Sequence, residues 1–209
     1  MTDREIVDQW LVVELSRKEV ADFSGDAQLD ADCAVGFVYV DSMCGMTLNV
    51  DAWCMAEGGS LRPISRPWDE KHRVMLRYDC FAGKRNRLLT PPERDTLGMP
   101  SLPDWLQHYY AGEETTRALR ALPLLDPVRA PGFPDDIKCL LYDTAVKEGE
   151  CIWAKLVRRE ADDLFVCRLL NEPFQDFGLH QGGLIRVAVK AHEDGLICVC
   201  IGKATANGT

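Results

Sequence analysis

Short apolar runs alternate with polar or turn-forming segments over the last third of the chain. Charged residues, glycines or both separate one run from the next. Five short runs at such spacing are typical of the strands of a small barrel or a strongly curved sheet. We therefore predict a C-terminal, five-stranded, barrel-like β module. The five runs are Ile137–Tyr142, Cys151–Val157, Leu164–Leu170, Leu184–Val189 and Leu196–Ile201.

The first third of the chain also has extended segments. Three runs predict a small antiparallel sheet, because β-branched and aromatic residues favour strands. Before them, the apolar run Trp10–Leu15 is of ambiguous type, and Ser16 and Glu19 follow at the spacing of a capping box, which marks a possible helix start. The three extended runs are Cys33–Val40, Met46–Trp53 and Arg73–Phe81.

Proline and glycine interrupt the middle of the chain. Between Leu88 and Pro103 they predict an irregular connector without regular structure. Pro103 and Asp104 then suit the start of a helix, and Glu113–Leu122 contains good helix formers. The middle of the chain is therefore expected to be helical and Pro-rich.

The stretch Asp126–Pro134 holds three prolines and a glycine, which disfavour both helix and strand. We place the border between two regions there, so that residues 1–134 form an α+β region and residues 135–209 form a small β-barrel-like module. The predicted fold class is α+β, with an N-terminal small antiparallel sheet, a helical, Pro-rich middle and a C-terminal five-stranded barrel-like module.

Composition narrows the range of partners. A formal net charge of -9 and a pI near 5.0 argue against nucleic acid, since nucleic-acid binding needs clustered lysine and arginine. The N-terminus lacks the basic and apolar regions of a signal peptide, and no apolar run is long enough to span a bilayer. We therefore expect a cytoplasmic protein without membrane contact.

The nine cysteines include no C-x-x-C pair, so we expect free thiols that pack as small apolar side chains. Cys198 and Cys200 alternate along one predicted strand, but two ligands do not complete a tetrahedral metal site. The glycine pair at Gly58 lacks the spacing of a phosphate-binding loop. We expect neither a metal nor a cofactor.

The order of three segments, Glu150–Leu156, Leu169–Pro173 and Gly178–Val187, resembles DUF2314, a family of uncharacterised bacterial domains. That family has an E-x-x-W strand, a strand that ends in N-x-P and a G-D-x-V turn. This chain has Gly183 where the family usually has an acidic residue, and it lacks the closing Asp-Trp pair near Asp194. The resemblance covers about the last third of the chain, implies a fold and supplies no catalytic residues.

The stretch Leu169–Val187 connects two predicted strands through turn chemistry. Asn171 can accept hydrogen bonds from nearby backbone N–H groups, and Pro173 ends ladder pairing. Gly178, Gly182 and Gly183 permit positive φ. A simple turn is one interpretation and a ligand-facing loop is the other. The candidate binding residues are Glu172, Phe174, Phe177 and His180 on this loop, and Trp68 in a polar, Pro-containing segment.

Two tryptophans are expected in different environments. Trp153 lies in an apolar run, so we expect it in the core, whereas Trp68 is expected to be partly exposed.

These features lead to three hypotheses of function. The first is a non-enzymatic binding protein, such as an immunity-type protein whose acidic surface neutralises a basic protein partner. The second is a small cysteine-dependent hydrolase with a cleft beside the 171–183 loop. Among the histidines, His180 is expected to lie nearest a cleft, while Cys167 precedes the same loop but is expected inside a strand, so the catalytic residues stay unassigned. The third is a structural homo-oligomer. The residues alone leave all three open.

Overall fold

The computed structural model describes residues 1–67, 72–111, 113–143, 148–193 and 195–205. Trp68, one of the candidate binding residues, lies outside them. The chain divides into two compact units, residues 1–109 and residues 110–209. The border expected from sequence, at 134/135, falls inside the second unit.

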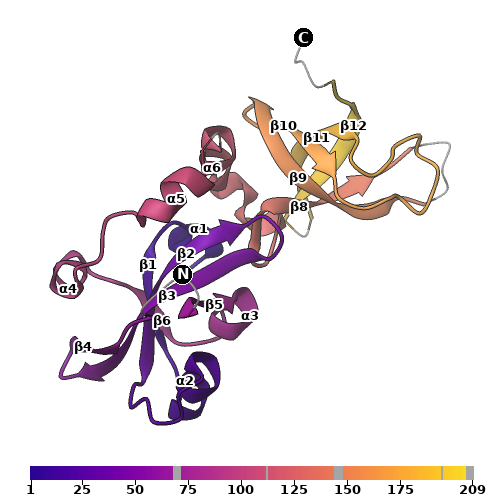
Figure 1. Ribbon diagram of the computed structural model, residues 1–209. Coiled ribbons are helices and arrows are strands. Elements are labelled where there is room, and N and C mark those ends of the chain that lie inside the picture. The colour runs from indigo at the N-terminus through magenta and orange to yellow at the C-terminus, as the bar shows by residue number, and fades with distance from the viewer. Residues whose placement is uncertain (68–71, 112, 144–147, 194, 206–209) are drawn as a thin grey trace. The chain divides into compact units, whose positions relative to one another are not determined.

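The first unit is built on a six-stranded antiparallel sheet (Figure 1). Its strands run in the order β4-β3-β2-β1-β6, and β5 pairs with the first half of β3. The pairing of β2 with β3 confirms the two central strands expected from sequence. The strands are β1 (Trp10–Glu14), β2 (Cys33–Asp41), β3 (Gly45–Glu57), β4 (Ser60–Ser65), β5 (Val74–Arg77) and β6 (Asn86–Leu88).

Side chains alternate along each strand and so point to both faces of this sheet. Both faces are covered. Leu11 of β1 and Val38 of β2 join one apolar cluster with Val20 and Phe81 of the helices. On the opposite face, the indole Nε1 of Trp10 donates to the Pro100 carbonyl at 2.7 Å. The helices of this unit are α1 (Asp3–Ile6), α2 (Arg17–Ser24), α3 (Tyr78–Phe81), α4 (Pro91–Leu97) and α5 (Asp104–Tyr109).

The helices confirm some expectations and correct others. The capping box of Ser16 and Glu19 starts α2, as predicted. The irregular connector expected from Leu88 to Pro103 is wrong, because Thr90 and Glu93 form a second capping box and prolines occupy the first turn of α4. The extended run expected up to Phe81 stops at Arg77, and α3 begins at Tyr78.

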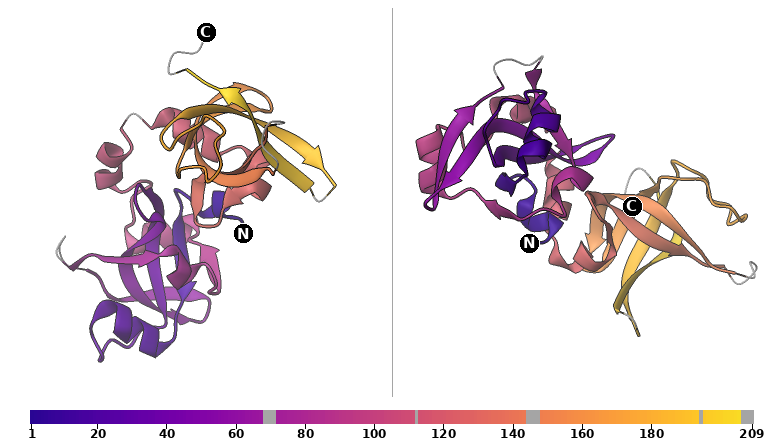
Figure 2. Two further views of the ribbon diagram at one scale, coloured as in Figure 1. Left: turned by 90° about the vertical axis from the view of Figure 1, so that its right-hand side faces the viewer. Right: turned by 90° about the horizontal axis from the view of Figure 1, so that it is seen from below.

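The second unit is a closed β-barrel of five strands. Strands β8 to β12 pair in sequence order, and the parallel pairing of β12 with β8 closes the ring, which Figure 2 (left) shows nearly end-on. All five strands predicted in this region are confirmed. They are β8 (Phe133–Leu141), β9 (Glu150–Ala161), β10 (Leu164–Leu169), β11 (Leu184–His192) and β12 (Gly195–Lys203).

Helical segments precede the barrel in this unit. The prediction that Asp126–Pro134 blocks regular structure is wrong, because η2, a 3-10 helix (Pro123–Val128), the two-residue strand β7 (Arg129–Ala130) and the start of β8 lie there. Pro123 occupies the first turn of η2, where the N–H that proline lacks would have no acceptor within the helix. Helix α6 (Glu114–Arg120) confirms the helix expected in this region. Leu119 and Leu125 from α6 and η2 are buried with the inward side chains of the barrel.

Candidate binding surface of the C-terminal barrel

The loop between β10 and β11, residues 170–183, leaves the end of the barrel where β8 ends and β9 begins (Figure 1). Both carboxylate oxygens of Glu150, the first residue of β9, accept from the Phe174 amide at 2.9 Å. The Gln175 amide donates to the same carboxylate at 3.1 Å. The amide side chain of Gln175 reaches the Glu148 carbonyl at 3.0 Å. These bonds fix a backbone that has no regular secondary structure.

Glu172 and His180, both predicted as binding residues, meet across this loop. The His180 Nδ1 lies 2.7 Å from Glu172 Oε1, and the Gln181 amide donates to Glu172 Oε2 at 2.7 Å. The backbone bond from Gln181, followed by the His180 contact, lowers the pKa of the exposed Glu172 carboxyl. As expected, Asn171 accepts a backbone hydrogen bond, here from the Trp153 amide at 3.2 Å.

The two phenylalanines of the loop have different environments. Phe177 packs on the barrel core together with Leu179. Phe174 is 97% exposed, between the two backbone amides that bind Glu150. Phe177 is therefore part of the fold, while Phe174 is free for an external contact.

The turn glycines also differ. Gly178 and Gly182 have φ of 62° and 81°, which confirms their expected role. Gly183 does not have a positive φ, contrary to prediction; a Cβ there would lie 2.9 Å from the His180 carbonyl oxygen. Close backbone approach is therefore the reason for glycine at this position.

Trp153 lies on the outer surface of the barrel and is 41% exposed, so its prediction as a core residue is wrong. Its strand alternates, and Ile152, Ala154 and Leu156 point inward. Apolar residues at every second position of β9 indicate a strand with one face in the core and one outside. The prediction for Trp153 instead took the continuous apolar run as a sign of burial on both faces.

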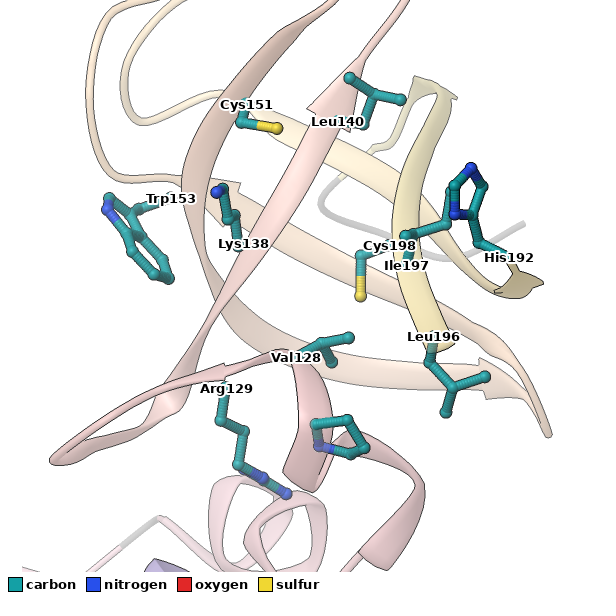
Figure 3. Close-up of a pocket in the computed structure, with 11 residues that line it drawn as sticks. Val128, Arg129, Lys138, Leu140, Cys151, Trp153, His192, Leu196, Ile197 and Cys198 are labelled. Carbon is teal, nitrogen blue, oxygen red and sulfur yellow. The ribbon is translucent and has the colours of Figure 1, made fainter. Parts of the chain in front are cut away.

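Two hollows flank the Trp153 side chain. One, with a volume of about 430 Å³, lies between η2, β8, β9 and β12, and Figure 3 shows Lys138 and Trp153 on neighbouring strands beside it. The other has a volume of about 510 Å³, and Leu170 and Asn171 join it to the start of the 170–183 loop. Its remaining lining residues are Ala130, Pro131, Phe133, Asp136 and Trp153.

Two adjacent aspartates of β8 have contrasting environments. Asp135 is buried and forms a two-pronged ion pair with Arg120 of α6, at 2.7 and 2.8 Å. Asp136 lines the second hollow, and burial raises its pKa to about 6, although the charge of Lys155 on the neighbouring strand opposes this shift. Asp136 forms neither a hydrogen bond nor an ion pair within 4 Å with any residue that the structure describes.

Five of the nine cysteines are buried. Inside the barrel, burial raises the pKa of Cys167 far above its usual range and that of Cys198 to about 12. Both are therefore protonated and packed at neutral pH. Cys151 is exposed on the outer surface. Among the described residues, no group of three or more His, Cys, Asp or Glu side chains is arranged to hold a metal ion.

No family model, no curated protein and no solved structure matches this chain. The resemblance to DUF2314 therefore stays a prediction. Within the described parts of the chain, no helix has the length and apolar character needed to cross a membrane.

Proposed function

We propose that this chain is a non-enzymatic binding protein that recognises a protein partner through the 170–183 loop and the adjoining Trp153 surface of its barrel. The exposure of Phe174 is the observation that carries the proposal. An exposed aromatic side chain forms an effective anchor when its backbone is fixed beforehand, because less conformational freedom is lost on binding. The Glu150 carboxylate provides that fixation.

The net charge of the chain indicates the character of the partner. Glu150, Glu172 and Asp176 lie on or beside the loop that presents Phe174. The whole chain carries a net charge of -9. Arg168 and Lys203 also lie at this loop, and Lys138 and Lys155 lie on the adjoining strands, so the acidic character belongs to the chain as a whole. A negative net charge attracts a basic partner and accelerates its association at low ionic strength. An immunity-type protein that covers a basic protein fits this character, and it is the form of the proposal that we favour.

Site-specific photo-crosslinking tests the proposal. A benzophenone amino acid is introduced at position 174 in the full chain, and at position 43 as a matched control, since Met43 is 85% exposed in the other unit. We expect ultraviolet irradiation in the cells of origin to produce a defined covalent adduct from position 174 only. Mass spectrometry then identifies the adduct and gives the isoelectric point of the captured protein.

A second variant tests whether the Phe174 side chain contributes to the affinity. Phe174→Ala is expected to fold with unchanged stability, since the side chain is exposed, and to lose at least tenfold in affinity for the captured protein. An adduct with a second copy of the chain would instead support the homo-oligomer. Equal crosslinking from positions 43 and 174, or unchanged affinity of Phe174→Ala, would contradict the proposal.

A further inference from the structure

The hollow beside Trp153 combines an apolar lining with one carboxylate that has no close partner. Phe133, Trp153 and Leu170 supply apolar surface, and Asp136 supplies the charge. Asp136 and Trp153 are diagonal neighbours across β8 and β9, because Asp136 pairs in register with Lys155 and Lys138 pairs with Trp153. Diagonal neighbours on a sheet are within reach of aromatic and long side chains. A ligand in the hollow can therefore contact the carboxylate and the indole together.

This combination favours a cation. A partly desolvated carboxylate attracts positive charge more strongly than an exposed one, since less water screens it. The face of an indole ring also attracts cations, and a guanidinium group stacks on it better than an ammonium group does. A guanidinium can donate two parallel hydrogen bonds to one carboxylate, which a lysine cannot.

Four charged side chains lie near Asp136, and a cation among them could compete with a ligand for its carboxylate. Lys155 is opposite on β9 and Lys138 is two residues along β8 on the outer face. Asp135 is adjacent but belongs to the buried pair with Arg120, and Arg129 of β7 donates to backbone carbonyls of α6 and β8. Lys155 is therefore the cation that competes most directly with an incoming ligand, and it approaches no closer than 4 Å.

We propose that the hollow formed by Phe133, Asp136 and Trp153 binds the guanidinium group of an arginine side chain presented by the protein partner. This inference rests on the proposed function and gives that surface a defined ligand chemistry. The arginine would enter beside the 170–183 loop, which shares Leu170 and Asn171 with the hollow.

The experiment is a titration of the full-length, 15N-labelled chain, followed by two-dimensional NMR. The probes are N-acetyl-arginine methylamide, its lysine analogue and its citrulline analogue, which is uncharged but nearly the same shape as arginine. The signal of the Trp153 indole is assigned from its absence in Trp153→Phe. We expect the arginine probe to shift the Trp153 indole and the amides of Asp136 and Asn171, with a Kd on the order of 1 mM.

Three comparisons make the result specific. The citrulline probe should bind at least tenfold more weakly than arginine, and lysine several-fold more weakly. Asp136→Asn should lose at least tenfold in arginine affinity, whereas Asp162→Asn, at a fully exposed carboxylate, should leave it unchanged. Lys155→Gln should strengthen arginine binding several-fold, because it removes the competing cation.

The inference is overturned if citrulline or lysine binds as tightly as arginine, if Asp136→Asn binds as the parent chain does, or if the shifts lie away from Trp153. These outcomes are separable from the fate of the proposed function. If the arginine probe does not bind but position 174 still forms a specific adduct, only the arginine site is rejected. Binding of the probe without any adduct from position 174 rejects only the loop as the partner surface.

Discussion

At the scale of single residues, Asp136 stands out because its carboxylate is desolvated and has no close partner. Its folded-state pKa of about 6 is higher than the value near 3.9 expected in an unfolded chain. The unfolded chain therefore releases this proton at lower pH than the folded chain does. The ionised side chain consequently destabilises the fold, and the effect develops as pH rises from about 4 to about 6.

We therefore predict that Asp136→Asn raises the free energy of unfolding at pH 7 by about 1–3 kcal/mol, and that the difference disappears near pH 4. Urea unfolding of both chains between pH 4 and pH 7.5 measures it. An equal effect at every pH would show that packing, and not the charge of Asp136, separates the two chains.

The cysteines give a second prediction at this scale, and it bears on the hydrolase hypothesis. Cys151 is exposed on β9, whereas Cys139, Cys167 and Cys198 lie inside the barrel, where burial raises their pKa. The thiolate is the reactive form. Native alkylation at pH 7.5, followed by mass spectrometry, should therefore modify Cys151 at least tenfold faster than the three buried thiols. Rapid labelling of Cys167 would support a nucleophile and contradict a core role.

The environments of several loop residues could not be predicted from the sequence. The separation of Phe174 from Phe177 depends on how the loop folds back on the barrel, and the spacing of the two residues does not encode this. Glu172 and His180 meet across the loop, where Gln181 also binds the Glu172 carboxylate, and the spacing of these residues does not encode that contact. Trp68 stays untested, since it lies outside the described residues.

At the scale of elements, α6 is attached to the barrel by buried charges. Arg120 and Asp135 are only 6% and 5% exposed, and the Arg120 side chain also lies over the Tyr110 ring at 5.4 Å. Arg129 donates to the carbonyls of Leu119 and Arg120 at the end of the helix. Removal of Asp135 would leave the buried guanidinium of Arg120 with only the partly exposed Glu113, at 3.4 Å, as a carboxylate partner, and a buried charge that loses its main partner is strongly destabilising.

We predict that Asp135→Ala lowers the free energy of unfolding by about 3–5 kcal/mol. Asp162→Ala removes a carboxylate from an exposed pair with Arg159 and is the matched control, for which we expect little change. Chemical unfolding of both variants provides the comparison. Equal stability of the two variants would mean that the α6 anchor lies elsewhere.

The elements that the sequence predicted well are those with a strong local signal. Five apolar runs gave the five barrel strands, and the Ser16 capping box gave α2. A capping box of the same kind at Thr90 begins α4, but the irregular connector was predicted from the prolines without regard to this capping box, although proline is favoured at a helix start. Closure of the barrel by the parallel pairing of β12 with β8 joins residues about 60 positions apart, for which the sequence offers no local signal.

At the scale of the whole molecule, the two units differ from the two regions expected from proline content. The prolines between Leu122 and Phe133 do not separate domains, because η2 and β7 lie among them and belong to the barrel unit. Leu119, Leu125 and Val128 precede the expected border but are buried with the barrel strands. Burial of side chains, rather than the interruption of regular structure, defines the unit.

This difference gives a direct test with two fragments. Residues 110–209 contain the barrel, its apolar helical segments and the Arg120–Asp135 pair, and a chain of this length can bury a core of its own. We predict that this fragment unfolds cooperatively, keeps the NMR shifts of the barrel and retains the arginine response at Trp153. Residues 135–209 are the matched control. They lack Leu119 and Leu125, and they leave the carboxylate of Asp135 without Arg120.

The shorter fragment should therefore fail to fold, because it exposes apolar barrel surface and retains a buried charge without compensation. Circular dichroism, thermal unfolding and amide shift dispersion distinguish the two cases. A folded 135–209 fragment would mean that the five strands alone suffice and that α6 and η2 are accessory. An unfolded 110–209 fragment would mean that the barrel depends on residues 1–109, and the binding surface would then have to be studied in the full chain.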